Sequence, residues 1–443
     1  MPARALIIVQ NLPVPFDRRV WLEATTLARH GYRVSVISPK AKGFNRSRER
    51  LEDVDVYRYR SLVEGRRALG LAFEFAWCFV MSAYLSLRVA LFGRGFDILH
   101  ICNPPETYWP LAWFWRAFGK VFVFDHHDLS PEMAAAKFGK SEGGLINVLL
   151  WLERRTFRAA QIVITTNESH KRVAVERGGK APEDVYVVRS GPDLSRFQRF
   201  PPRHRYRKGR RFLLVYLGEM CAQDGVDYLI RSIKMLRDDI GRADFHCILV
   251  GGGPHQPSIA AYADDMGAAD LCTFTGRISD EELCRILSSA DIAIDPDPKT
   301  AWSDASTMNK IAEYMYFGLP IVAFDLHEAR VSAGAAALFV EPNSERRMAD
   351  AIDQLLDDRQ RRLAMSACGQ ERIANVLAWQ YSVPPLLAAY VAAERRAAGR
   401  RAGTARASEA ALQHLEGAAA SRPFRSTGLR RRSGGEPGGS RYV

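Results

Sequence analysis

Strand-like apolar runs followed by amphipathic helices recur along both halves of the chain, and this pattern constrains the fold most. The alternation begins at Leu6 and begins again at Phe212, after a basic, proline-containing stretch over residues 200–211. Alternating strands and helices predict parallel sheets whose two faces are covered by helices. We therefore expect an α/β protein with two Rossmann-like, doubly wound domains that face each other across a cleft, where ligands bind at the carboxyl ends of the strands.

The chain is long enough for two such domains. At 443 residues it exceeds the size at which a single hydrophobic core stops growing. We expect an N-terminal domain over residues 1–200, a C-terminal domain over residues 209–375 and a crossover helix over residues 376–395.

The remaining residues, 396–443, differ in composition from the rest. They contain ten Arg and three Glu and few large apolar side chains, so we expect a disordered basic tail. Such a tail is either a solvated extension or a segment that contacts nucleic acid or an anionic membrane surface. We expect no specific nucleic-acid partner.

The composition is that of an ordinary soluble protein, with 47% hydrophobic and 25% charged residues. The seven Cys include no C-x-x-C pair, which favours a reducing compartment and argues against a disulfide framework or a zinc site. The first ten residues lack the apolar length of a signal peptide. We therefore expect a cytoplasmic protein without a metal site.

A phosphate site is predicted where Ser306-Thr307-Met308-Asn309 opens a short helix that Gly318 closes. Ser306 or Thr307 is a suitable N-cap residue. A helix that opens in this way points free N–H groups and the positive end of its dipole at whatever precedes it. An anionic diphosphate is therefore the expected ligand.

Two charged residues of this helix lie one turn apart on the same face. Lys310 would add positive charge near the diphosphate, and Glu313 would accept two hydrogen bonds from the hydroxyls of a ribose. Taken alone, the segment is equally compatible with a surface helix that carries an ion pair between these two residues.

Two segments of the N-terminal half, residues 71–92 and 110–118, are rich in aromatic side chains. Within the first, Glu74 and Arg88 leave too few uncharged residues between them to span a bilayer. This segment is either a helix buried against the first sheet or a helix in the membrane interface. In the second case it exposes five aromatic residues, which are Phe73, Phe75, Trp77, Phe79 and Tyr84. We favour membrane contact through both segments, because so many aromatics exceed what a packing helix requires.

Six motifs occur in order along the two halves. They are Asp17-Arg18-Arg19-Val20-Trp21, Cys102-Asn103-Pro104-Pro105-Glu106-Thr107, Phe124-Asp125-His126-His127-Asp128-Leu129-Ser130-Pro131-Glu132, Gly251-Gly252-Gly253-Pro254, Phe274-Thr275-Gly276-Arg277 and Asn309 to Met315. Together they resemble the family 4 glycosyltransferases, over residues 4–393. The resemblance implies a two-domain glycosyltransferase architecture of the B type and metal-independent, retaining transfer of a sugar from a nucleotide-sugar donor. It also implies a donor site mainly in the second half and no cofactor, since the nucleotide sugar is a substrate.

The resemblance assigns donor contacts to the second half. In similar proteins a glycine loop lies close to the donor sugar, and Gly251, Gly252 and Gly253 follow a predicted strand here. Arg277 belongs to a segment that resembles the one whose backbone meets the nucleotide base. Glu313 matches the carboxylate that binds the donor ribose. Lys310, Asn309, Thr307 and Ser306 complete the predicted donor-binding set.

Three residues of the first half are candidates for the cleft. In similar proteins a His at the position of His127 approaches the donor sugar and the acceptor, and Asp128 is expected beside it as a second catalytic residue. His126 would point the other way along an extended segment. Arg18 and Arg19 occupy a loop where many relatives have a Gly-Gly pair near the diphosphate. Arginine would supply charge there, but only one of the two can face the cleft.

Three positions depart from the family pattern. Where many relatives have a first Glu eight residues before Glu313, this chain has Ala305, and Asp304 beside it would point in another direction. Where relatives have two cations near the leaving diphosphate, this chain has Glu219 and Asp224. Either the cations are rearranged, with Lys310, Arg18 or Arg277 compensating, or activity has been lost. We favour rearrangement, because the rest of the donor site is present.

These observations predict a retaining glycosyltransferase that moves a hexose-type residue from a nucleotide diphosphate donor to a lipid-linked or polysaccharide-precursor acceptor. We expect it in the cytoplasm, in peripheral contact with the inner face of the membrane. The alternative is a catalytically silent nucleotide-sugar-binding subunit that supports an active partner. A dinucleotide-binding oxidoreductase is disfavoured, because no G-x-G-x-x-G motif follows the first strand.

Overall fold

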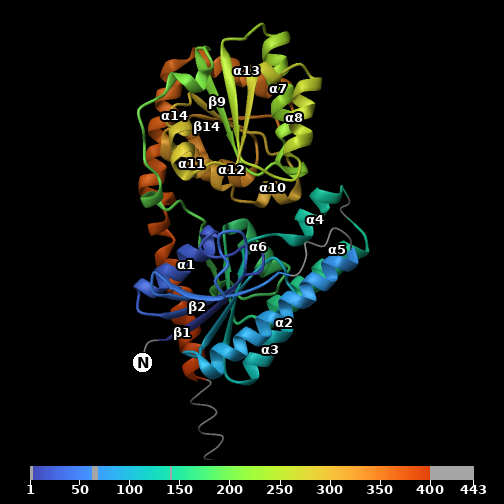
Figure 1. The fold of residues 1–443 in the computed structure, drawn as a ribbon, viewed down its shortest axis with the longest axis vertical. Coiled ribbons are helices and arrows are strands. Elements are labelled where there is room, and N and C mark those ends of the chain that lie inside the picture. Colours follow the sequence, from blue (N-terminus) through green and yellow to red (C-terminus); the bar gives the residue numbers. More distant parts are fainter. Residues whose placement is uncertain (1–2, 62–67, 140–141, 400–443) are drawn as a thin grey trace, which may run out of the picture. The chain divides into compact units, whose positions relative to one another are not determined.

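The computed structural model describes residues 3–61, 68–139 and 142–399. Residues 1–397 belong to one compact unit, in which two β-sheets follow one another along the chain (Figure 1). The predicted tail over residues 396–443 lies outside the described residues from residue 400 onward. The predicted α/β class with two parallel-sheet domains is confirmed.

The first sheet has eight strands in the order β3-β4-β2-β1-β5-β6-β7-β8. Neighbouring strands are parallel except β3 and β4, which pair antiparallel. Its strands are β1 (Arg4–Ile8), β2 (Arg33–Pro39), β3 (Arg48–Leu51), β4 (Val54–Tyr59), β5 (Ile98–Cys102), β6 (Val121–His126), β7 (Ile162–Thr165) and β8 (Val185–Val187).

Helices cover both faces of the first sheet. One face packs against α1 and the last described helix, residues 383–399, and the other packs against α2, α3 and α5. The helix α1 begins where Asp17 accepts a hydrogen bond from the backbone N–H of Val20, 3.1 Å away. The helices are α1 (Arg18–Arg29), α2 (Ala68–Phe92), α3 (Trp109–Ala117), α4 (Ser130–Phe138), α5 (Gly144–Ala159) and α6 (Glu168–Glu176).

The second sheet has six parallel strands in the order β11-β10-β9-β12-β13-β14. Its strands are β9 (Phe212–Leu217), β10 (Phe245–Val250), β11 (Cys272–Gly276), β12 (Ile292–Asp295), β13 (Ile321–Phe324) and β14 (Ala337–Val340). Its helices are α7 (Val226–Asp238), α8 (Gln256–Asp265), α9 (Asp280–Leu287), α10 (Ala301–Ala305), α11 (Asn309–Phe317), α12 (His327–Ala333), α13 (Glu345–Asp357) and α14 (Arg359–Arg372).

Short helical turns complete the described elements. They are η1 (Pro182–Asp184), η2 (Leu194–Arg196), η3 (His204–Arg207), η4 (Ala222–Asp224), η5 (Ala269–Leu271), η6 (Gly334–Ala336), the π-helical turn η7 (Ile373–Leu377) and η8 (Trp379–Tyr381).

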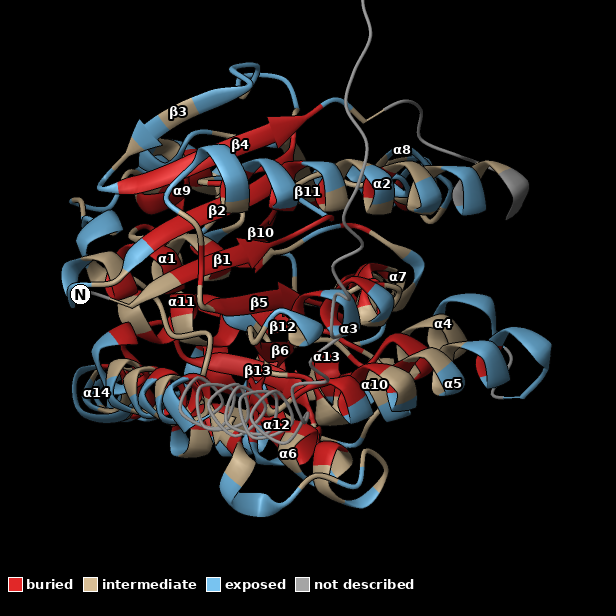
Figure 2. Cartoon of the chain, turned by 90° about the horizontal axis from the view of Figure 1, so that it is seen from below, coloured by how far each residue is buried: buried red, intermediate tan, exposed pale blue. Residues whose placement is uncertain are grey.

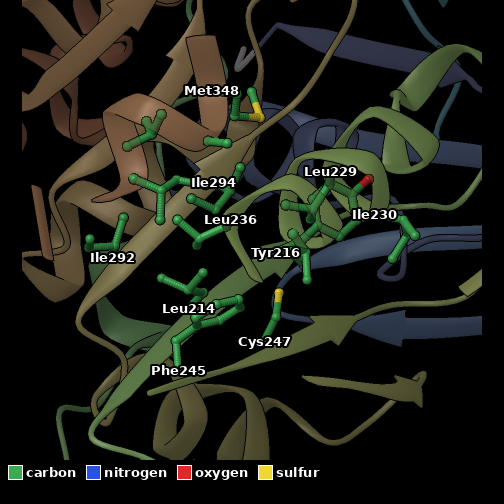
Figure 3. Packing of buried hydrophobic residues seen from close by; sticks show 14 of the residues in the cluster. Leu214, Tyr216, Leu229, Ile230, Leu236, Phe245, Cys247, Ile292, Ile294 and Met348 are labelled. Atoms are coloured by element: carbon green, nitrogen blue, oxygen red, sulfur yellow. The ribbon is translucent and has the colours of Figure 1, made fainter. Parts of the chain in front are cut away.

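Alternate residues of β9 belong to two different cores. Leu214 and Tyr216 pack with Leu229 of α7 and Met348 of α13 (Figure 3), whereas Leu213 and Val215 pack with α9 and α11 on the other face. The central strands of both sheets are buried on both faces (Figure 2), as the short apolar runs in the sequence predict.

The order of the strands determines where a ligand can bind. The direction of winding reverses between β1 and β5 in the first sheet and between β9 and β12 in the second. In doubly wound sheets the loops that follow the strands separate at such a reversal and leave a crevice at their carboxyl ends. The predicted site residues should therefore gather at these two edges.

Candidate active site

A cleft of about 570 Å³ is lined by the carboxyl edges of both sheets. The first domain contributes the loop after β1, the start of α1 and the segment after β6, and the second contributes the loops after β9, β10 and β11 and the start of α11. Nine predicted site residues line it, which are Arg18, His127, Asp128, Gly251, Gly252, Arg277, Ser306, Thr307 and Asn309. Glu313 lines an adjoining cavity of about 490 Å³, and Gly253 and Lys310 line neither cavity.

His127 follows β6 on the first-domain wall of the cleft, and its side chain contacts Asp125. The Nδ1 atom of His127 lies 3.1 Å from Oδ2 of Asp125, because residues two apart in an extended chain point to the same side. Burial lowers the pKa of His127, but the Asp125 carboxylate outweighs burial and raises that pKa to about 9. The imidazole is therefore charged at neutral pH and offers Nε2–H as a second donor.

Arg19 binds the same carboxylate from the other side. Its Nε and Nη2 atoms lie 3.1 Å and 2.9 Å from the two oxygens of Asp125, and Nη2 also lies 3.1 Å from Glu23. Burial opposes the charge, but Asp125 and Glu23 outweigh it and raise the pKa of Arg19. The side chain of Arg19 is thus turned into the first domain, and Arg18 is the arginine that reaches across the cleft.

Asn103 fixes the backbone of the segment that carries His127. Its Oδ1 accepts hydrogen bonds from the backbone N–H groups of His127 and Asp128, at 2.8 Å and 3.2 Å. Its Nδ2 donates to the carbonyl of Asp128 at 2.6 Å and to Oε1 of Glu106 at 2.8 Å. Burial raises the pKa of the Asp128 carboxyl, which lines the cleft beside His127.

His126 points away from the cleft, which confirms the expected alternation along the strand. Its Nε2 atom lies 3.3 Å from Glu153, and its ring packs against Phe157 of α5. The side chain is fully buried. His126 and His127 therefore lie on opposite sides of the chain and do not form a paired metal site.

The helix α11 directs its N-terminal end at the cleft, but its predicted cap is wrong. Met308 is the N-cap residue, and no side chain caps the helix there. Ser306 donates to the carbonyl of Trp302 at 2.6 Å, and Thr307 accepts from Asn167 of the first domain at 2.9 Å. The first N–H groups of α11 therefore have no side-chain cap, which suits an anion in the cleft.

Lys310 does not face the cleft, which corrects its predicted position near a diphosphate. Its Nζ atom lies 2.7 Å from Asp297 and 3.0 Å from Asp295, and all three side chains are buried. Burial and the neighbouring Asp295 raise the pKa of Asp297 well above its ordinary range. The lysine balances this carboxylate pair inside the second domain, since an unpaired charge there would be costly.

Glu313 is bound to Arg18 of the other domain. The Nη1 atom of Arg18 donates to Oε1 of Glu313 at 3.0 Å. Burial raises the pKa of Glu313, and Arg18 opposes this shift. Arg18 also lies 3.6 Å from Asp280. The carboxylate predicted to bind a ribose thus already has a partner across the cleft.

The glycine loop after β10 packs closely against the loop after β9. A Cβ atom on Gly251 would lie 1.8 Å from the carbonyl oxygen of Gly218, and one on Gly253 would lie 2.6 Å from that of Met220. Gly251 donates its N–H to the carbonyl of Gly276 at 3.1 Å, so this N–H is not available to a phosphate. A Cβ atom on Gly252 would lie no closer than 3.6 Å to any other heavy atom. Gly252 is therefore the glycine that leaves space for a ligand.

The departures from the family pattern have different consequences in space. Asp304 accepts a hydrogen bond from the backbone of His327 at 2.8 Å and lies outside the cleft, so it does not replace the missing carboxylate at Ala305. Asp224 accepts from the backbone N–H of Cys221 at 2.8 Å and also lies outside the cleft. Glu219 lines the cleft. Only one of the two acidic substitutions therefore opposes a diphosphate directly.

Arg277 provides positive charge in the second-domain part of the cleft. Its guanidinium lies 4.9 Å from the ring centroid of Phe16, a residue of the first domain that also lines the cleft. Arg277 and Arg18 are therefore the arginines that can serve a ligand in this space. Arg19 makes two hydrogen bonds to Asp125 inside the first domain, whereas Arg18 makes one to Glu313 across the cleft.

A group of potential metal ligands lies beneath the cleft. His100, Cys102 and Asp125 bring one ligand atom each within 4.8 Å of one another, and all three are buried. Arg19 already binds both oxygens of Asp125. A cation at this point would have to compete with the guanidinium.

The predicted aromatic segments form α2 and α3. The helix α2 is long and apolar enough to cross a membrane, by length and composition only. One face of it, with Cys78, Leu85 and Val89, is buried against the first sheet. Of the five aromatic residues expected to be exposed, Phe73 and Tyr84 are exposed, and Phe75, Trp77 and Phe79 are half-buried. One face of this segment is thus buried against the first sheet, as the first reading predicts, and the other face is exposed. Contact of the exposed face with a membrane stays a prediction.

Several residues of the site were absent from the predicted set. Asp125 and Arg19 hold His127, Asn103 holds its backbone, and Asn167 contacts Thr307 across the cleft. The spacing of Asp125 and His127 is the one feature of the sequence that indicates this network. Side chains two positions apart on a strand point to the same side of the sheet.

Comparison with known proteins agrees with this architecture. A family model described as Glycosyltransferase Family 4 matches residues 17–196, and one described as Glycosyl transferases group 1 matches residues 211–358. A GDP-mannose-dependent alpha-(1-6)-phosphatidylinositol monomannoside mannosyltransferase from Mycobacterium tuberculosis is 32% identical over 198 residues, which are 43% of this chain and 51% of that protein. The chain thus spans about half the length of that relative.

Two further proteins match over more of their length. A D-inositol 3-phosphate glycosyltransferase from Thermomonospora curvata is 26% identical over 72% of this chain and 76% of that protein. The sucrose-phosphate synthase of Thermosynechococcus elongatus has a TM-score of 0.69 at 17% identity and covers 88% of this chain and 98% of its own. The fold is that of a two-domain, B-type glycosyltransferase. The chain belongs to the family 4 glycosyltransferases.

Proposed function

We propose that this protein is a retaining glycosyltransferase, which moves a hexose-type sugar from a nucleotide diphosphate donor to a lipid-linked or polysaccharide-precursor acceptor at the inner face of the cytoplasmic membrane. The observation that carries the proposal is the cleft, in which the uncapped start of α11 in one domain and the charged His127 in the other line one space. In this reaction the bond between the anomeric carbon and the diphosphate breaks, and the nucleoside diphosphate leaves with the electron pair. The acceptor oxygen then forms the new bond on the same face of the sugar.

The second domain supplies the donor site. The N–H groups at the start of α11 suit the diphosphate, and Gly252 leaves space for the sugar. Arg18 and Arg277 supply the positive charge that Glu219 and Asp224 do not. No metal ion is required in this arrangement, because the arginines and the helix stabilise the leaving group.

The first domain supplies a charged donor to the reacting centre. His127 is fixed at Nδ1 by Asp125 and at its backbone by Asn103. Its Nε2–H can therefore bond to a hydroxyl of the sugar or to an oxygen of the leaving group without reorganising. Asp128 lies beside it as a candidate acceptor for the proton of the incoming hydroxyl.

The lipid part of the proposal is supported by a surface and by a relative. The helices α2 and α3 expose several large apolar residues, which are Phe73, Val80, Tyr84, Leu87, Leu91, Phe92, Trp113 and Phe114. Such a surface suits the interface of a membrane. The name of the mycobacterial relative specifies a phosphatidylinositol monomannoside, which is a lipid.

Release of nucleoside diphosphate tests the proposal. Purified protein is incubated with GDP-mannose, UDP-glucose and other common sugar nucleotides, each with and without membrane lipid extract. We expect one donor to release nucleoside diphosphate, and we expect this release to depend on the lipid extract. A glycolipid product should gain the mass of one transferred sugar residue. No release from any donor would contradict the enzyme assignment.

The silent-subunit alternative is favoured by one observation, which is the carboxylate of Glu219 in the cleft. It predicts donor binding without turnover, unchanged when Ala305 and Asp224 are replaced by Glu and Lys. Measurable turnover by the unchanged protein excludes it.

A further inference from the structure

We infer that the apolar groove between α2 and the loop after β5 binds the hydrocarbon chain of the acceptor lipid. This inference rests on the proposed function and names a binding site for part of its acceptor. The groove has a volume of about 490 Å³ and is distinct from the cleft.

The lining of the groove is apolar except at one residue. The helix α2 contributes Ala72, Phe75, Ala76, Phe79 and Val80, and the other wall consists of Thr107 and Pro110. Ala72 and Ala76 are one helical turn apart and exposed, so their small side chains leave the space that larger ones would fill. A solvent-exposed apolar trough of this kind favours an apolar ligand over water.

The wall opposite α2 comes from the loop after β5, which positions His127, and from the start of α3. Thr107 follows Glu106, whose carboxylate accepts from Asn103 at 2.8 Å and from Ser130 at 2.6 Å. Asn103 in turn holds the backbone of His127. The ring of Tyr108 contacts Phe79 of α2 with a centroid distance of 5.8 Å. One short loop thus separates the groove from the first-domain wall of the cleft.

Charge favours an acceptor lipid as the occupant. The cleft presents charged side chains of both signs, among them Arg18, Arg277 and Asp128, whereas the described residues that line the groove include no charged side chain. A polar headgroup and its hydrocarbon chain match these two regions in that order.

The exposed face of α2 supplies a route into the groove. Val80 lines the groove and is 57% exposed, and Phe73, one residue from Ala72, is 63% exposed. These residues continue the apolar surface of α2 and α3, whose outward faces are exposed (Figure 2). A chain in the outer part of a membrane can therefore enter without crossing polar surface.

The test fills the groove and compares two acceptors that differ only in chain length. In Ala76→Trp the indole occupies the groove. Ala261→Trp places the same ring at an exposed position of α8, outside both the groove and the cleft. The probes are dipalmitoyl- and dibutanoyl-phosphatidylinositol monomannoside, and the readout is kcat/KM for sugar transfer, with thermal unfolding as a check on folding.

We expect Ala76→Trp to lower kcat/KM by about tenfold or more for the dipalmitoyl probe, since several methylenes lose a buried site. The value for the dibutanoyl probe should change by less than about twofold, and Ala261→Trp should change neither value. An equal loss for both probes, or no loss, would overturn the groove assignment while leaving transfer itself intact. Absence of transfer by the unchanged protein to every acceptor would overturn the proposed function, and the acceptor site with it.

A photoreactive chain gives a second, independent result. The dipalmitoyl probe with a diazirine near the chain end is cross-linked to the protein in lipid nanodiscs, and the labelled residues are mapped. Labels on residues 72–80 and 107–110 that disappear in Ala76→Trp support the inference. Labels confined to Leu87, Leu91 and Phe92 would show surface contact with the membrane and overturn it.

Discussion

Arg18 of the first domain donates a hydrogen bond to Glu313 of the second, with 3.0 Å between Nη1 and Oε1. Each residue is a predicted donor contact, and each is the other's partner when the cleft is empty. In the function proposed above, a donor exchanges this ion pair for two contacts of its own, Glu313 with the ribose and Arg18 with the diphosphate. Since Arg18 is half-exposed at 48%, we expect the pair itself to contribute little to stability.

Replacing Glu313 by Ala should weaken nucleoside diphosphate binding. Hydrogen bonds to a charged group contribute about 1.5–3 kcal/mol, so we expect a loss of roughly tenfold to a hundredfold in affinity, measured by calorimetry. The 2′,3′-dideoxy nucleotide lacks the hydroxyls and should bind both proteins alike. Glu281→Ala, an exposed carboxylate that pairs with Arg285 within α9, serves as the control. Unchanged affinity of Glu313→Ala for the ribonucleotide would contradict the ribose assignment.

Replacing Asp125 by Asn should lower the pKa of His127. The pKa is about 9 because Asp125 outweighs the opposing effect of burial, and the neutral amide removes that contribution while Asp128 and Arg19 remain. We expect NMR titration of the labelled imidazole to show a midpoint well below 9 in the variant. An unchanged midpoint would show that Asp125 does not control the proton.

The same shift has a consequence for stability. The folded-state pKa of His127, about 9, lies above its ordinary value of 6.5. Its contribution to the free energy of unfolding is therefore fully present below pH 6.5 and is lost as pH rises through 9. Glutamine does not titrate, so the free energy of unfolding of His127→Gln should not show this decline between pH 6.5 and 9. Denaturant titrations of both proteins across this pH range measure it.

The fold follows from local patterns more completely than the site does. Central parallel strands such as β12 are short apolar runs between helices, so the sequence predicts them. The edge strand β3 reads Arg-Glu-Arg-Leu and exposes its polar side chains, and β8 has three residues, so neither carries a periodic signal.

The site residues divide in the same way. The start of α11 is a local motif, and the sequence locates it to within two residues. The contacts Arg19 to Asp125 and Arg18 to Glu313 join residues 106 and 295 positions apart, and only the packing of the sheets brings them together. Lys310 faces inward because its acidic partners are the last residue of β12, Asp295, and Asp297 just after it. The position of Lys310 on its helix does not reveal these partners.

Replacing Lys310 by Met should destabilise the second domain. It leaves Asp295 and Asp297 buried without their cation, and breaking a buried pair costs about 3–5 kcal/mol. We expect this loss to appear in the free energy of unfolding, measured by urea denaturation. The double variant with Asp297→Asn should recover part of it, because a neutral amide then replaces the carboxyl group that Lys310 no longer balances. Donor affinity measured well below the unfolding transition should change far less than in Glu313→Ala, since Lys310 does not line the cleft.

Two adjacent glycines should respond differently to one added methyl group. A Cβ on Gly251 would lie 1.8 Å from the carbonyl oxygen of Gly218, at a φ of 128° that side chains rarely adopt, so the two loops must separate. We expect Gly251→Ala to lower the free energy of unfolding by about 2 kcal/mol or more. The Cβ of Gly252→Ala would meet nothing closer than the Cγ of Arg277 at 3.6 Å, so stability should change by less than about 0.5 kcal/mol.

Because that methyl group enters the cleft beside Arg277, the same variant should raise KM for the sugar nucleotide while leaving the affinity for the nucleoside diphosphate nearly unchanged. Equal stability of the two variants in urea would contradict the close approach of the loops. If Gly252→Ala weakened binding of the sugar nucleotide and of the nucleoside diphosphate equally, the donor sugar would lie elsewhere.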